Sequence, residues 1–417
     1  MRSTGLGSDL RLQRGAWLAA LLAWLMLLLL PLGRSAELPL LIAALLAIPL
    51  LWKRWRCASL GLVLIAFAAY VLPAALSAID AVDPRKAWTT TVASLRFGLF
   101  ACAMVLLLGG KPQVQKTLAQ GVAALVALWT LDAVAQAFTG WSLGGPLHAD
   151  RVSGIFGADN LKLGPVLAVL SPFVLLAARE RLGSAGLLAA WLLLGFAILM
   201  AGARAGWVMF GVVGVVLLWR ELARPAAFAA LLGVALALSA LLATVSYRFS
   251  PVFAERIDRT AAVFGGDRAS LDHALAGRLP IWDTALAMSR AHPINGVGVR
   301  GFRHAYADFA APDDPWLAPQ NGGAALHPHQ LLLELTAETG VPGLLAWLTA
   351  AWLAWRAWQR ATAVARSQAL APGLALVAMT FPFNTHFAFY SSFWGLLFWW
   401  LLGLYAAALA KSAQEAR

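Results

Sequence analysis

Long apolar runs follow one another along most of this chain, and one long polar segment interrupts them. A helix needs about 20 apolar residues to cross the ~30 Å hydrocarbon core of a bilayer. The pattern therefore predicts an all-α, polytopic membrane protein with about 12 transmembrane helices. The predicted spans are 15–32, 37–52, 58–79, 88–108, 115–137, 161–178, 184–201, 204–220, 225–246, 341–357, 368–385 and 390–410.

The interruption covers residues 247–340 and holds five of the seven histidines, eight arginines and ten of the twenty acidic residues. Apolar and polar residues alternate at helical spacing over 251–264, 271–290 and 302–309, with glycine-containing turns between them. We therefore expect a small helical cap domain. The predicted organisation is 1–246 with nine membrane helices, 247–340 with the site, and 341–417 with the last three helices.

Composition and charge agree with this class of protein and add its orientation. Hydrophobic residues make up 61% and charged residues 12% of the chain, against roughly 25% charged in ordinary soluble domains. Of the 32 lysines and arginines, 17 lie on the side that carries both termini, and six lie on the opposite side outside the polar segment. Cytoplasmic loops are enriched in basic residues. We therefore expect both termini in the cytoplasm and the polar segment on the other face, and the net charge of +12 does not indicate a nucleic-acid partner.

The end of the polar segment, HPHQ at 327–330, is the first candidate site. Proline is favoured at the first position of a helix, so Pro328 predicts a helix that has His329 in its first turn and continues through Glu338. The positive end of the helix dipole disfavours a charged imidazole, so His329 would stay neutral and able to accept a proton. His327 and Glu338 would support it. The alternative is that both histidines only cap a helix at a wet interface.

Three arginines on the same predicted face form the second candidate site. Arg278 is expected in the middle of a cap helix, Arg204 at the outer mouth of the eighth span, and Arg151 in the other outer loop. Guanidinium forks match the oxygens of phosphate groups, so the three suit an anion with several oxygens. The alternative is that each anchors its own loop or extends to the membrane interface.

Two charges are expected inside the membrane, Arg96 in the fourth span and Asp132 in the fifth. Charged side chains at this depth face the bundle interior and usually pair. We therefore expect an Arg96–Asp132 ion pair, with a role in lining a lipid-headgroup cavity as the second possibility.

Several other patterns do not indicate a site. The GxGxxG pattern at 296–301 follows a helical loop rather than a strand, so it does not predict a nucleotide site. The chain has no Walker P-loop, no HExxH motif and no cysteine-based zinc pattern. We therefore expect neither a cofactor nor a resident metal.

Five short motifs resemble those of the O-antigen ligase/polymerase superfamily, bacterial inner-membrane enzymes that handle glycans carried on undecaprenyl diphosphate. They are RVSGIFGADNLKLG (151–164), GARAGW (202–207), GRLPIW (277–282), HPINGVGVRGF (292–302) and HPHQLLLELTAETGVPG (327–343). The resemblance covers essentially the whole chain. It implies that His329 is the family's essential histidine and that Arg204 and Arg278 are its two essential periplasmic arginines. Two departures are Gln330, where many members have Asn, and Ala203, where many have Ser.

Within the superfamily the chain resembles ligases most. The expected reaction transfers O-antigen from undecaprenyl diphosphate to a sugar hydroxyl of lipid A-core, without a metal and with inversion. His329 would act as the base, and Arg278, Arg204 and Arg151 would bind the diphosphate. The expected partners are the lipid-linked donor glycan, lipid A-core and membrane lipids. The expected location is the inner membrane, with the active site in the periplasm.

Other functions stay open at this stage. An O-antigen polymerase or a protein O-oligosaccharyltransferase would use the same donor with another acceptor. A secondary transporter or lipid flippase would use Arg96, Asp132 and His386 as a path through the membrane. The single large outer loop and the lack of an internal repeat argue against the transporter.

Overall fold

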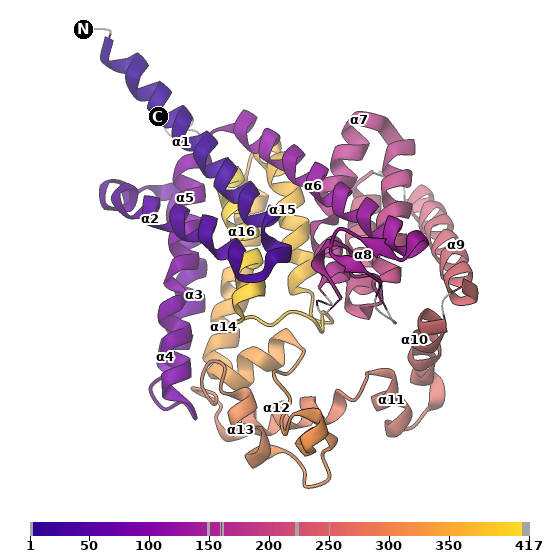
Figure 1. Cartoon of the computed structure of the whole chain (residues 1–417). Coiled ribbons are helices and arrows are strands. Elements are labelled where there is room, and N and C mark those ends of the chain that lie inside the picture. Colours follow the sequence, from indigo (N-terminus) through magenta and orange to yellow (C-terminus); the bar gives the residue numbers. More distant parts are fainter. Residues whose placement is uncertain are drawn as a thin grey trace. The chain divides into compact units, whose positions relative to one another are not determined.

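A computed structural model describes residues 3–147, 151–158, 160, 162–221, 225–249 and 251–410, and almost all of its regular structure is helical (Figure 1). The α-helices are α1 (Ser3–Leu28), α2 (Glu37–Arg54), α3 (Gly61–Ser77), α4 (Pro84–Ala93), α5 (Leu95–Leu108), α6 (Pro112–Thr139), α7 (Leu163–Met200), α8 (Arg204–Glu221), α9 (Pro225–Phe249), α10 (Pro251–Ala261), α11 (Arg268–Ala274), α12 (Leu279–Ala291), α13 (Phe302–Phe309), α14 (Leu331–Arg360), α15 (Ala363–Thr380) and α16 (Ser392–Leu409). The 3-10 helices are η1 (Leu30–Ala36), η2 (Ala58–Leu60), η3 (Gly154–Phe156), η4 (Ala262–Gly265), η5 (Pro315–Leu317) and η6 (Pro319–Asn321). Among the described residues, the strands are β1 (Trp141–Ser142) and β2 (Gly145–Pro146), which pair antiparallel with Trp141 opposite Pro146.

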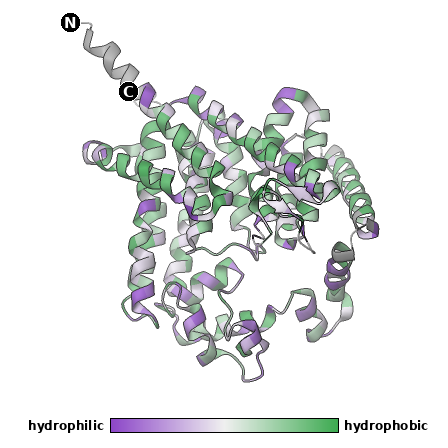
Figure 2. Ribbon diagram, in the orientation of Figure 1, coloured by the Kyte–Doolittle hydropathy of each residue, from purple (hydrophilic) through white to green (hydrophobic). Residues whose placement is uncertain are grey.

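The predicted class, an all-α polytopic membrane protein, is confirmed. Each predicted apolar run falls largely on a helix, and eight helical segments in the described part are long and apolar enough to cross a membrane. Apolar residues cover the long helices in Figure 2, whereas α10 to α13 carry more hydrophilic residues.

Two glycines with positive φ bend long helices. Gly183 (φ +68°, ψ −154°) divides α7, and the two halves run back along each other, since a Cβ on Gly164 would lie 3.1 Å from the Cβ of Ala201. This is why α7 contains two predicted spans. Gly340 (φ +68°, ψ −176°) divides α14 into a part that ends at residue 339 and a part that begins at residue 341. The second break coincides with the predicted start of the tenth span.

The described residues group into two compact units by their contacts. Unit 1 comprises 1–121, 279–373 and 387–417, and in it α14 packs along α3 while α2 and α16 pack along α5. Unit 2 comprises 122–278 and 374–386, and in it α8 packs along α7. The three parts expected from the sequence are consecutive along the chain, whereas these units are grouped by contacts. The three-part organisation therefore stays a prediction.

We expect Gly340→Ala to destabilise the protein by more than about 2 kcal/mol. A left-handed backbone costs a residue with a Cβ about 1–2 kcal/mol, and the added Cβ would also overlap the carbonyl oxygen of Ile294. Thermal unfolding in detergent measures the loss. The matched control is Gly211→Ala in α8, where the added Cβ meets nothing within 4 Å. Equal stability of the two variants would contradict the prediction.

Candidate functional site

The candidate histidine lies just outside α14 rather than in its first turn. The helix begins at Leu331, and Gln330 is its N-cap, with its side-chain oxygen accepting the N–H of Leu333 at 2.6 Å. His329 has a left-handed backbone with φ +54°. The expectation that Pro328 opens the helix is therefore wrong, because the Gln330 cap starts the helix three residues later. His329 still precedes the free N–H groups of the first turn.

Neighbouring groups hold the His327–His329 turn. The N–H of His329 donates to Nδ1 of His327 at 3.2 Å, and the two imidazole rings lie 3.9 Å apart between centroids. Nε1–H of Trp282, on α12, donates to the carbonyl oxygen of Pro328 at 3.0 Å. An accepting Nδ1 places the proton of a neutral His327 on Nε2. His327 thus positions His329.

Positive φ in residues other than glycine is rare, and such residues concentrate at functional sites. Among the described residues it occurs at Ala276 (+59°), Arg300 (+63°) and His329 (+54°). His329 is the expected base, and Ala276 precedes Arg278 by two residues. Backbone strain is invisible in the sequence, so this signal comes from the structure alone.

Two buried carboxylates follow on the first part of α14. Glu334 is 0% exposed and accepts the N–H of Phe389 at 3.0 and 3.1 Å through its two oxygens. Glu338 is 1% exposed and accepts the N–H of Arg300 at 2.9 Å. Both therefore tie distant backbone segments to the helix that follows His329. Glu338 was among the predicted site residues and Glu334 was not, although their spacing of four residues in an apolar stretch was a usable signal.

The glycine-rich motif at 292–302 forms a backbone strap across the bend of α14. Val297 N–H donates to the Ala337 carbonyl at 2.8 Å, and Gly298 N–H donates to the Glu338 carbonyl at 3.1 Å. A Cβ on Gly298 (φ +94°) would overlap Ala81, which follows α3. The glycines thus serve close backbone packing.

A cluster of arginines lies within unit 2. Arg204, the first residue of α8, donates to the Ala274 carbonyl and to Oγ1 of Thr260, the latter at 3.2 Å. Arg278 donates to the Leu275 carbonyl at 3.2 Å. Burial, and then the charge of Arg204, lower the pKa of Arg278 to about 10, so its guanidinium is still charged at neutral pH. An anion placed between these charges would relieve their repulsion.

Arg278 is not in the middle of a helix as expected. Ala276 and Gly277 (φ +73°) have left-handed backbones, and Gly277 N–H donates to the Asp272 carbonyl at 2.9 Å. This arrangement ends α11, and α12 begins only at Leu279. Arg278 therefore lies in the turn between the two helices.

Two further arginines on α10 escaped sequence analysis. The guanidinium of Arg256 packs so closely on Gly202 (φ +69°) that a Cβ there would overlap it. Arg259 forms an ion pair with Glu255 at 3.0 Å. The sequence did contain a signal for these two arginines. They lie three residues apart on an amphipathic helix, and Gly202 precedes Arg204 by two residues.

Arg151 is half-buried in the loop that precedes α7. The next residue, Val152, donates its N–H to the Met200 carbonyl at 3.3 Å, which brings this loop to the turn before Arg204. Asp159 and Leu161 of the same motif lie outside the described residues.

The two membrane charges have partners other than each other. Arg96 pairs with Glu37 at 3.4 Å, donates to Ser392 Oγ at 3.3 Å and lies 4.3 Å from the centre of the Phe97 ring. Asp132 accepts the N–H of Leu143 at 2.8 Å. Each charge thus helps hold its own unit, and the expected Arg96–Asp132 ion pair stays a prediction.

Together, these elements define a polytopic helical membrane protein. Its polar segment before the last helices holds buried acids and a strained histidine, and arginines of this segment cluster with Arg204 of α8. Residues 188–348 match the family model described as O-antigen ligase. The match confirms the resemblance to the O-antigen ligase superfamily, and the matched segment contains Arg204, Arg278, His327, His329 and Glu338.

This family match supports a bacterial membrane enzyme of the O-antigen ligase/polymerase type, similar to glycosyltransferases, with lipid-linked glycans and lipid A-core as the general class of partners. A comparison with curated proteins returned no similar sequence.

Proposed function

We propose that this protein is an O-antigen ligase of the bacterial inner membrane. It transfers O-antigen polysaccharide from undecaprenyl diphosphate to a sugar hydroxyl of lipid A-core. The observation that carries the proposal is His329, which has a strained left-handed backbone between the His327 ring and the Gln330 cap, inside the segment that matches the family.

In the proposed step, His329 removes the proton of the acceptor hydroxyl as that oxygen attacks the anomeric carbon of the donor. The new bond joins the acceptor oxygen to the anomeric carbon. The bond from that carbon to the diphosphate breaks, and undecaprenyl diphosphate leaves with the electron pair. Direct displacement inverts the anomeric configuration, and the donor bond itself supplies the driving force.

The arginines would serve the leaving group. Negative charge grows on the diphosphate in the transition state, and fixed guanidiniums stabilise such charge. We assign this role to Arg278 and Arg204, with Arg151 as a third contact. The proposed orientation places both termini in the cytoplasm and the polar segment in the periplasm.

Transfer with purified components tests the proposal. The protein in nanodiscs, with undecaprenyl-diphosphate glycan and lipid A-core, should produce glycosylated lipid A-core at the same rate in excess EDTA as without it. Loss of transfer on chelation would contradict a role for arginines in place of a metal. Transfer only to a second lipid-linked glycan, or only to a protein, would contradict the ligase assignment in favour of the polymerase or the oligosaccharyltransferase.

Deletion of the gene gives an independent readout of the acceptor. Loss of a ligase leaves rough lipopolysaccharide and an accumulated lipid-linked polymer. Loss of a polymerase leaves a core that bears one repeat unit. Uptake of labelled substrate into sealed vesicles without a glycan product would instead indicate a transporter.

A further inference from the structure

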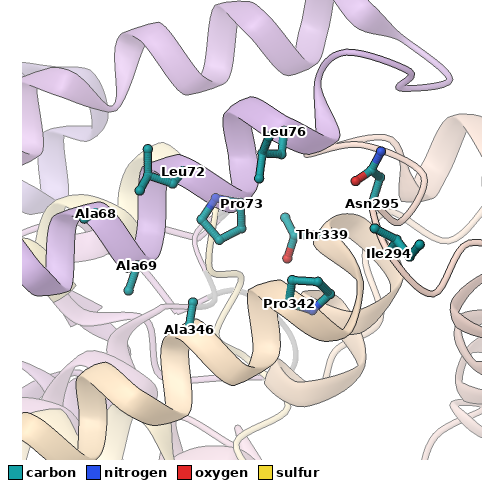
Figure 3. A pocket seen from close by; sticks show the side chains of 10 residues that line it. All are labelled: Ala68, Ala69, Leu72, Pro73, Leu76, Ile294, Asn295, Thr339, Pro342 and Ala346. Atoms are coloured by element: carbon teal, nitrogen blue, oxygen red, sulfur yellow. The ribbon is translucent and has the colours of Figure 1, made fainter.

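An apolar groove of about 320 Å³ lies in unit 1 between α3 and the part of α14 after Gly340 (Figure 3). Ala68, Ala69 and Leu72 line it from α3, and Pro342 and Ala346 line it from α14. Both helices belong to segments long and apolar enough to cross a membrane. The rim is open, because Leu72 and Leu76 are 60% and 55% exposed. An open apolar groove between two such helices suits a lipid hydrocarbon chain.

One end of the groove is polar. Asn295 and Thr339 line this end (Figure 3), and Nδ2 of Asn295 donates to both carboxylate oxygens of Asp80 at 3.1 Å. Asn295 belongs to the backbone strap that crosses the bend of α14. A chain in the groove would thus have its head group at the strap.

Two arginines lie next to the buried acid Glu338, Arg300 in the strap and Arg303 on α13. Arg300 and Arg303 are half-buried, and the Arg300 backbone is fixed in its left-handed conformation by Glu338. Burial and the charge of Arg300 lower the pKa of Arg303, while Glu338 opposes this shift. Among the described residues, neither guanidinium donates a hydrogen bond. Two half-buried arginines next to each other on the fold suit a phosphate or carboxylate group, because guanidinium forks match its oxygens.

These features follow one another along α14. His329 precedes the helix, and Glu338 accepts the N–H of Arg300 in the strap. The next residue, Thr339, lines the groove. From Leu331 to Glu338 the helix rises about 10 Å. Along the chain, the order is therefore a base, an anion site and a site for a hydrocarbon chain.

That order matches the acceptor and not the donor. The proposed function assigns the donor diphosphate to Arg278 and Arg204, so a second anion site, in unit 1, suits the other substrate. In an acylated glycolipid that is phosphorylated at its lipid end, sugars separate the charge from the accepting hydroxyl.

We propose that unit 1 is the acceptor site, in which Arg300 and Arg303 bind an anionic group of the glycolipid and the α3–α14 groove holds one of its acyl chains. This inference rests on the proposed function, because it takes lipid A-core as the acceptor.

Binding to a variant that does not turn over, His329→Asn, tests the anion site. Arg300→Gly removes the guanidinium and keeps the positive φ, which glycine adopts freely, and Arg303→Gln is combined with it. We expect the double change to weaken binding of phosphorylated lipid A-core roughly 10–100-fold, the range for lost charge-assisted hydrogen bonds. Binding of the dephosphorylated lipid should stay unchanged. The matched control is Arg290→Gln, which changes an exposed arginine of α12.

The groove is tested with Ala346→Phe, which fills it from α14, and with Ala69→Phe, which fills it from α3. Each should weaken binding of acylated lipid A-core about tenfold or more and leave binding of the deacylated glycan unchanged, since several buried CH₂ groups are displaced. Ala351→Phe, at an exposed alanine of α14, is the control. Thermal unfolding of every variant confirms that it is folded.

Three results would overturn the inference: unchanged binding in the folded variants, equal losses for the modified and unmodified lipids, or weaker binding of the donor instead. Failure of the proposed function is a separate outcome. A protein that never transfers glycan to lipid A-core can still bind the glycolipid at this site.

Discussion

Replacement of His329 by asparagine is expected to lower kcat for glycan transfer roughly 100–10,000-fold, the usual contribution of a general base. Asparagine tolerates the left-handed backbone that this position requires, so the turn should keep its conformation. The variant therefore removes the base without removing the fold. Transfer by the purified protein from undecaprenyl-diphosphate glycan to lipid A-core measures the effect.

The control for this variant is His304→Asn. His304 is exposed on α13, 3.7 Å from Asp83, and has no proposed part in catalysis. This variant should keep full activity. A His329→Asn enzyme that retained normal kcat, or lost activity only through KM, would contradict the assignment of His329 as the base.

We expect Arg278→Gln to lower kcat roughly 100–1,000-fold, as the loss of one donor that stabilises transition-state charge does. The charge on the diphosphate grows as the bond breaks, so kcat should fall more than KM rises. Arg278→Lys should recover part of the rate, because lysine keeps the charge and loses the fork. Single-turnover kinetics with saturating donor separates the chemical step from binding.

Arg268→Gln is the matched control, because Arg268 is an exposed arginine on the neighbouring α11. Equal losses in both variants would mean that the general basic charge of this region, and not Arg278, matters. Arg204→Gln should resemble Arg278→Gln, since the two charges lie close enough to affect each other.

Several local features of this protein were predictable from single stretches of sequence. The apolar runs predicted the membrane helices because a span is defined by its own length and hydrophobicity. The helix over 302–309 was predicted at the bounds that the structure gives to α13. His329, Arg204 and Arg278 could be selected because each lies in a short contiguous motif, HPHQ, GARAGW or GRLPIW, that can be recognised without the fold.

The sequence by itself thus determined the class of protein and the polar segment, and it supplied the candidate site residues. Only the tertiary structure decided how they are held. The N-cap of α14 fell on Gln330 because its side chain reaches Leu333, and Arg278 entered a turn because Ala276 and Gly277 are left-handed. Contacts between residues far apart in the chain, such as Glu334 with Phe389 and Glu338 with Arg300, decided where the buried acids act. Periodicity and motifs report local energetics, whereas these hydrogen bonds exist only after distant segments have packed together.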